Sequence, residues 1–194
     1  MRHRRSGRKL GRNPNHQRAL LRNLASALFL TERDAEDDEN APKVKGRIVT
    51  TLAKAKEVRP LVERCITIAL KGLQAENKAQ DHGTSAEHGS SEWETWRESK
   101  KWQDWNAAIA PAIHARRPVL QLIGDKQAVR VLFDIADRFE DRPGGYTRIV
   151  RLAKPRLGDA GQRVMLEFVG VRDRVSQSSE APAFEGEESK SDGE

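Results

Sequence analysis

Two runs near the carboxyl end of the chain decide the fold. Residues 146–152 read Tyr-Thr-Arg-Ile-Val-Arg-Leu, and residues 163–169 read Arg-Val-Met-Leu-Glu-Phe-Val. Polar and apolar side chains alternate along both runs, which is typical of strands with one buried face. The segment between them contains Pro155, Gly158 and Asp159, residue types that favour turns. The two runs therefore predict an antiparallel β-hairpin.

The sequence before the hairpin predicts three helices and one more strand. Asn13 and Pro14 suit the start of a helix over about residues 14–30, because leucines follow at helical spacing. Residues 46–50 are a strand candidate, and Thr51 can cap a second helix.

The second helix carries an apolar stripe from Val58 to Leu70, and Pro60 is expected to bend it. Asp125 can cap a third helix with Val129, Leu132 and Phe139 on its buried side. We therefore expect an α+β fold in which three helices pack on one face of a small three-stranded sheet.

A length of 194 residues suits one domain with additions. The expected organisation is a basic arm over residues 1–12, a single α+β domain over 13–173 and an acidic, disordered tail over 174–194. Two insertions are expected within the domain, an acidic one over 32–45 and a tryptophan-rich, helical one over 74–112.

The net charge of +6 averages over regions of opposite sign. Residues 1–31 hold eight Lys or Arg and no acid. Residues 32–41, 74–112 and 174–194 carry −5, −3 and −4, which leaves +18 on the other 124 residues. A flexible basic arm beside such a core is typical of RNA binding, because each neutralised phosphate releases counterions.

All four tryptophans fall within residues 93–105. Helical spacing places Trp102, Trp105 and Ile109 on one face, and Pro111 predicts that this helix ends or bends before Ile113. Two interpretations remain open, a helix that docks on a partner protein and a helix that covers its own domain.

Enzyme and metal motifs do not occur in the sequence. There is no phosphate-binding glycine loop, no dinucleotide fingerprint, no zinc-protease helix and no nucleophile elbow. A single cysteine, Cys65, excludes an internal disulfide and a four-cysteine zinc site, and its apolar neighbours indicate a buried side chain. We expect no enzyme activity, no cofactor, no metal and no small-molecule substrate, and the uncharged stretches are too short to span a membrane.

Short motifs occur in order along the chain: Met1-Arg2-His3-Arg4, Gly7-Arg8, His16-Gln17-Arg18-Ala19-Leu20, Arg22-Asn23-Leu24, Arg47-Ile48, Thr50-Thr51, Lys54-Ala55-Lys56-Glu57 and Gly144-Gly145-Tyr146-Thr147-Arg148-Ile149. Together they resemble the L-seventeen family of bacterial large-subunit ribosomal proteins. The resemblance covers about residues 1–30, 46–73 and 114–173. It begins at Met1, which argues against the organellar presequence that an acid-free, arginine-rich start would otherwise suggest.

The resemblance implies a structural constituent of the cytoplasmic large ribosomal subunit that supports translation by binding large-subunit (23S) ribosomal RNA, without catalysis. Neighbouring ribosomal proteins are expected partners, through Trp93, Trp96, Trp102 and Trp105. The residues implied in RNA binding are Arg2, His3, Arg4, Arg5, Arg8, Lys9, Arg12, His16, Arg18, Arg22, Lys54, Lys56, Arg116, Arg117, Gly144, Gly145, Tyr146, Thr147 and Arg148.

Alternatives stay open for the protein and for one residue. The same basic arm would serve a free-standing nucleic-acid-binding regulatory or architectural protein, and the acidic insertions would serve an adaptor that recruits other proteins. For Tyr146, packing against the helices is as plausible as stacking on a base, and Arg148 would then be a structural residue at the rim.

Overall fold

A computed structural model describes residues 7–35 and 38–170 of the chain. Within these ranges the chain forms five α-helices, one 3₁₀-helix and a three-stranded sheet. The elements are α1 (Pro14–Leu30), β1 (Arg47–Thr51), α2 (Leu52–Gln80), α3 (Ser91–Glu98), α4 (Lys100–Ile123), α5 (Lys126–Asp134), η1 (Ala136–Phe139), β2 (Thr147–Arg151) and β3 (Arg163–Phe168). The predicted α+β class is confirmed.

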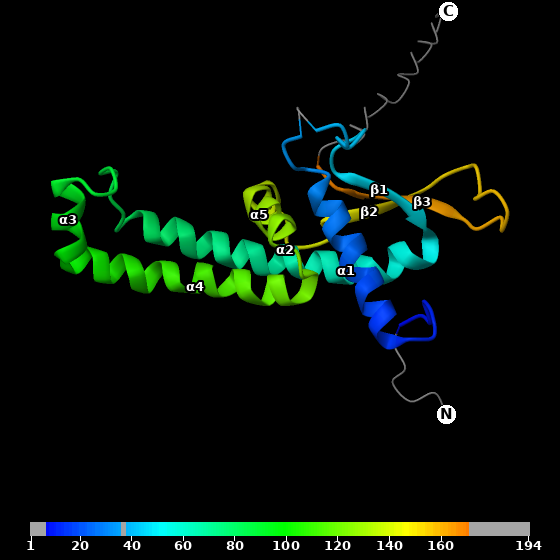
Figure 1. Ribbon diagram of the computed structural model, residues 1–194, viewed down its shortest axis with the longest axis horizontal. Coiled ribbons are helices and arrows are strands. Elements are labelled where there is room, and N and C mark those ends of the chain that lie inside the picture. The colour runs from blue at the N-terminus through cyan, green and yellow to red at the C-terminus, as the bar shows by residue number, and fades with distance from the viewer. Residues whose placement is uncertain (1–6, 36–37, 171–194) are drawn as a thin grey trace, which may run out of the picture.

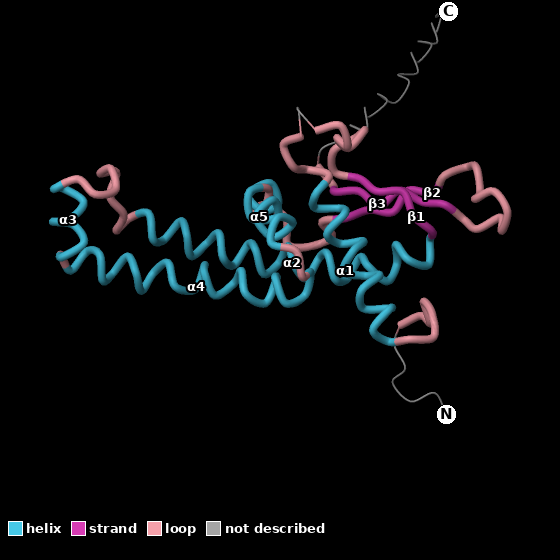
Figure 2. The backbone as a smooth tube through the Cα atoms, in the orientation of Figure 1, coloured by secondary structure: helices cyan, strands magenta, loops and turns pink. Residues whose placement is uncertain are grey.

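The sheet is antiparallel throughout, with β3 between β1 and β2. The hairpin predicted from the two alternating runs is β2 and β3. Val164, Leu166 and Phe168 alternate along β3 and are buried toward the helices, whereas Val49 on the opposite face is 51% exposed. The helices therefore cover one face of the sheet, as predicted (Figure 2).

Three phenylalanines join α1 and η1 to the sheet. The ring centroid of Phe168 lies 5.9 Å from that of Phe29 and 5.7 Å from that of Phe139. All three side chains are buried. Because each ring belongs to a different element, this cluster packs α1 against η1 and the sheet. It thereby determines which face of α1 is exposed to solvent.

The prediction of three helices was wrong in number, because α4 is a fourth helix of the core. Its residues Val119 and Ile123 are buried in the same core as α1, α2 and α5. Pro111 and Pro118 both lie inside α4, so the helix does not end before Ile113, which was one of the two outcomes predicted from Pro111. Both prolines lie outside the buried stripe, and the packing of that stripe offsets a cost of about 3 kcal/mol for each interior proline.

Helices α2 and α4 form a long antiparallel hairpin that projects from the domain, with α3 at its far end (Figure 1). At Gly72 a Cβ atom would lie 2.8 Å from Cε1 of Phe133 and 3.1 Å from Cβ of Ala115. Only glycine fits this approach of α2 to α4 and α5. The expected limits of the second insertion, residues 74 and 112, fall inside α2 and α4.

The arm is described only in part, and the tail over residues 174–194 lies outside the described residues. Residues 7–12 contact the domain: Gln17 donates from Nε2 to the carbonyl of Gly11 at 2.9 Å, and Arg8 Nε lies 3.6 Å from Glu57 Oε1. Residues 1–6, 36–37 and 171–194 are the parts that the structure does not describe, so the prediction of a disordered tail is not tested.

Candidate nucleic-acid interface

Helix α1 presents a polar face away from the core. Asn13 caps the helix by accepting a hydrogen bond from the backbone N–H of Asn15 at 2.8 Å, as its position before Pro14 predicted. Ala25, Leu28 and Phe29 anchor the buried side. The exposed residues include Asn15, Arg18, Ala19, Arg22 and Asn23, whose spacing of three and four places them on adjoining turns.

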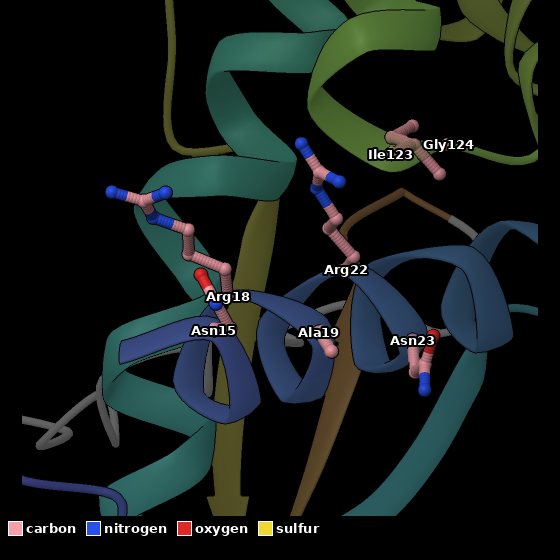
Figure 3. A pocket seen from close by; sticks show the side chains of 7 residues that line it. All are labelled: Asn15, Arg18, Ala19, Arg22, Asn23, Ile123 and Gly124. Atoms are coloured by element: carbon pink, nitrogen blue, oxygen red, sulfur yellow. The ribbon is translucent and has the colours of Figure 1, made fainter. Parts of the chain in front are cut away.

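A hollow of about 500 Å³ lies between this face and the end of α4. Ile123 and Gly124 close one side of it, and α1 supplies the polar side (Figure 3). Arg18 and Arg22 extend side by side from α1, and Arg22 points toward α4. A guanidinium nitrogen of Arg22 donates to the carbonyl of Gln121 at 2.9 Å, which holds the cation at the last turn of α4, where backbone carbonyls lack helical partners.

The hollow is electropositive. None of the described residues that line it carries a carboxylate. Arg18 forms no ion pair with any residue in the described ranges, and neither do Lys9, Arg12 and His16 nearby in the sequence. A guanidinium has five donors in a planar fork that matches a phosphate. This surface is therefore suited to a polyanion.

Arg8 lines a second hollow, of about 420 Å³, at the start of α2. Arg156 and Asp159 of the β2–β3 loop line its other side and pair with each other. That pairing, with a hydrogen bond from the backbone N–H of Gly161, holds the pKa of Asp159 well below its usual range. Lys54 and Lys56 follow in the first turns of α2, with Lys56 exposed.

The two arginines predicted on α4 differ in their surroundings. Arg116 donates to Glu76 Oε1 at 2.9 Å, and its Cζ lies 5.0 Å from the ring centroid of Phe133. Arg117 is exposed and has no ion-pair partner among the described residues. Arg117 is thus the freer of the two for an external anion.

Residues 146–148, at the start of β2, make contacts within the protein instead. Tyr146 is 4% exposed, and its ring meets that of Phe139 edge to face at 5.5 Å. Thr147 is 2% exposed and donates from its hydroxyl to Glu63 Oε1 at 2.9 Å. Arg148 Nε donates to Glu167 Oε1 at 2.6 Å. Of the two interpretations of Tyr146, the structure favours the core residue.

Gly144 and Gly145, which precede β2, matter for the conformation of the backbone. Gly145 has a φ of +65°, in the left-handed region that favours glycine, and nothing lies within 4 Å of the position of a Cβ atom at Gly144 or Gly145. The turn is therefore open to solvent. Arg2, His3, Arg4 and Arg5 lie outside the described residues.

Sequence reasoning missed the two asparagines of the α1 hollow. Asn15, Ala19 and Asn23 recur every four residues, which places two amides and a small side chain along one line of the helix. This spacing is visible in the sequence. The hollow is not, because Ile123 and Gly124 at the end of α4 close it from the opposite side.

The single cysteine of the chain, Cys65, is buried. Burial raises the pKa of the Cys65 thiol to about 12, which makes it a poor nucleophile. Within the described ranges no group of three His, Cys, Asp or Glu is placed to hold a metal ion. No helix in those ranges has the length and apolar character needed to cross a membrane.

Comparison with known proteins matches this chain to one family. The sequence profile of Ribosomal protein L17 matches residues 20–169. A large ribosomal subunit protein bL17 from Rhodopirellula baltica is 65% identical over 193 residues, which cover 99% of this chain and 92% of the relative. Proteins of the same name from Nitratidesulfovibrio vulgaris and Agrobacterium fabrum are 35% and 34% identical, covering 94% and 95% of this chain and 98% and 99% of their own lengths. The chain therefore belongs to the ribosomal protein L17 family.

Proposed function

We propose that this chain acts as a structural constituent of the large ribosomal subunit in the cytoplasm by binding the 23S ribosomal RNA through the face of α1 and the arm that precedes it. Membership of the L17 family supports the ribosomal role and a protein without catalysis. The observation that carries the binding mode is the carboxylate-free hollow that holds Arg18 and Arg22.

The hollow can recognise RNA by shape as well as charge. Arg18 and Arg22 would bind phosphates, and the amides of Asn15 and Asn23 would hydrogen-bond 2′-hydroxyls or base edges. Ala19 lets the RNA backbone approach the helix closely. The Arg22 bond to Gln121 holds that side chain in place before RNA binds, which lowers the entropy lost on binding.

The arm extends this contact along the RNA. Its residues can follow an irregular RNA surface, and each neutralised phosphate adds counterion release. The proposed contacts from the arm and helices are Arg2, His3, Arg4, Arg5, Arg8, Lys9, Arg12, His16, Arg18, Arg22, Lys54, Lys56, Arg116 and Arg117. Gly144 and Gly145 would meet RNA through their backbone, while Tyr146, Thr147 and Arg148 hold that turn against the domain.

The far end of the α2–α4 hairpin would contact a neighbouring ribosomal protein. Residues 81–105 hold six Asp or Glu against three Lys or Arg, and Glu92, Glu94 and Glu98 among them are exposed, so the net charge of this end repels phosphate. The tryptophans Trp93, Trp96, Trp102 and Trp105 shape this end: Trp96 lies edge to face with Trp105 at 5.6 Å and donates to the carbonyl of His82 at 3.1 Å. Trp93 lies between His88 and Arg97. The tip would present its acids to a basic protein surface.

Sucrose-gradient fractionation of cells that express the tagged chain tests the main proposal. We expect the chain to sediment with large subunits at moderate salt. The double variant Arg18→Glu, Arg22→Glu should shift to the top of the gradient. A wild-type pool bound to DNA or free of subunits would instead favour a free-standing nucleic-acid-binding protein.

Crosslinking of intact subunits tests the hairpin. The triple variant Glu92→Lys, Glu94→Lys, Glu98→Lys should enter subunits but lose protein crosslinks from Lys100 and Lys101. Asp34→Lys, Glu39→Lys, Glu140→Lys is a control that reverses three exposed acids elsewhere in the chain and should keep these crosslinks. If the triple variant keeps them as well, the acidic tip is not the contact.

A further inference from the structure

A third cavity, distinct from the α1 hollow and the hollow beside Arg8, is a groove between α4 and α5. Its volume is about 270 Å³. Ile113, Leu120 and Val129 form an apolar floor, and Ile113 is 49% exposed. Arg116, Arg117 and Lys126 line the same groove. An apolar floor with three cations around it fits a ligand with an apolar centre and acidic flanks.

The charges in the groove are only partly neutralised from within the domain. Glu76 pairs with Arg116, which also stacks on Phe133. Arg117 and Lys126 have no ion-pair partner among the described residues. The nearest acid in sequence, Asp125, is occupied as the cap of α5 and accepts from the N–H groups of Gln127 and Ala128. Two cations therefore remain for an external acid.

The carboxyl-terminal tail contains a segment of matching chemistry. Residues 180–188 read Glu-Ala-Pro-Ala-Phe-Glu-Gly-Glu-Glu. Phe184 is the only aromatic residue after Phe168, and Glu180, Glu185 and Glu187 flank it. We infer that this segment docks in the groove between α4 and α5, with Phe184 on the apolar floor and its glutamates beside Arg117 and Lys126.

The tail is long enough to reach the groove. Phe168 at the end of β3 contacts Phe139, with ring centroids 5.7 Å apart. Phe139 is ten residues from Val129 through α5 and η1, and the rise of these two helices separates them by at most about 20 Å. The 14 residues from Gly170 to Phe184 span up to about 45 Å when extended. A tether of this length gives an effective concentration on the order of millimolar, so even a weak contact is occupied.

Docking would cover Arg117 and Lys126 until a polyanion that binds these cations more tightly displaces the segment. The consequence that ribosomal RNA displaces the segment rests on the proposed function, because Arg117 is one of the proposed RNA contacts. The docking itself does not, since it needs only the tail and the groove of the same chain.

Disulfide formation in the full chain tests the docking. The pair Ile113→Cys, Ala183→Cys places one thiol at the groove margin and one beside Phe184, and cysteine keeps a small apolar side chain at residue 113. The control pair is Val49→Cys, Ala183→Cys, because Val49 is equally exposed and lies on β1, next to the strand from which the tail leaves. Cys65 is buried with a raised pKa and does not compete.

At about 1 µM protein, far below the millimolar effective concentration of a tether, we expect the groove pair to close within one chain at least tenfold faster than the control pair. Adding Phe184→Ala, or Glu185→Gln with Glu187→Gln, should bring that rate down to the control. Equal rates for the two pairs, crosslinked dimers as the main product, or a rate insensitive to Phe184→Ala would each overturn the docking. Added ribosomal RNA should slow closure; if it does not, only the displacement fails.

Discussion

Arg18 on α1 and Arg148 on β2 are the same residue type with the same role expected from family resemblance, yet the structure places them differently. Arg18 is exposed and lines a hollow without carboxylates. Arg148 lies across the strand pair from buried Glu167, and its Nε bonds that carboxylate. The difference shows that the partners already present around a cation, and not its charge alone, decide whether it is available to RNA.

The same contrast extends to the residues around each arginine. The α1 group is turned to solvent, so changing it should alter RNA affinity and leave folding intact. The turn and strand at 146–148 contribute to packing and buried hydrogen bonds, so changing them should lower the free energy of unfolding. Two measurements, RNA affinity and stability, therefore separate the two regions.

The largest effect is expected from Tyr146→Ala. Losing a buried ring that packs on Phe139 should lower the free energy of unfolding by about 3 kcal/mol. Urea denaturation measures this loss, and the folded fraction should bind RNA as before. Tyr146→Phe keeps the ring and serves as the control. A loss of RNA affinity without a loss of stability would show that Tyr146 stacks on a base.

The double variant Arg18→Ala, Arg22→Ala should weaken RNA binding and leave the free energy of unfolding nearly unchanged. Removing two phosphate contacts should weaken RNA binding about thirty-fold, close to 2 kcal/mol, and reduce the salt slope of log K by about 1.5. Filter binding at several salt concentrations measures both. Arg97→Ala, Lys100→Ala removes two cations from the hairpin tip and should change neither quantity. A slope unchanged by the α1 variant would contradict the proposed contact.

Sequence alone was sufficient for elements whose signals are local. Asn13, Pro14 and the leucines after them predicted α1, and the alternation within residues 146–152 and 163–169 predicted β2 and β3. The first half of α4 was predicted as part of the tryptophan-rich insertion, but its second half was missed because Pro111 and Pro118 locally argue against a helix. Its stability comes from packing on α2, for example beside Gly72, which is distant in the sequence.

For the candidate site, the sequence predicted the location but not the shape. The acid-free composition of residues 1–31 indicated where RNA would bind. Its hollow was not predictable, because Ile123 and Gly124 complete it from another helix. Nor could the sequence show that Thr147 meets Glu63, since the two residues lie 84 positions apart.

The hydrogen bond between Thr147 and Glu63 gives a smaller test. Thr147→Val removes a buried donor while Arg59 still pairs with Glu63, so the free energy of unfolding should fall by only about 1 kcal/mol. Thermal unfolding of the purified chain measures the change. Thr147→Ser keeps the hydroxyl and should recover most of the loss. If RNA affinity falls instead, the strand contributes to the interface directly.

The smallest expected effect is the difference in RNA affinity between a variant at Arg117 and one at Arg116, which both lie on α4. Arg117→Gln removes a cation without an ion-pair partner in the described ranges and should weaken RNA binding about threefold. Arg116→Gln removes one that Glu76 already neutralises in part and should weaken binding less, at a stability cost below about 1 kcal/mol. Fluorescence anisotropy with labelled ribosomal RNA measures both affinities, and thermal unfolding measures the cost. Equal losses of affinity would mean that RNA displaces Glu76 from Arg116, and the partner a cation has in the free protein would then no longer predict its role in the complex.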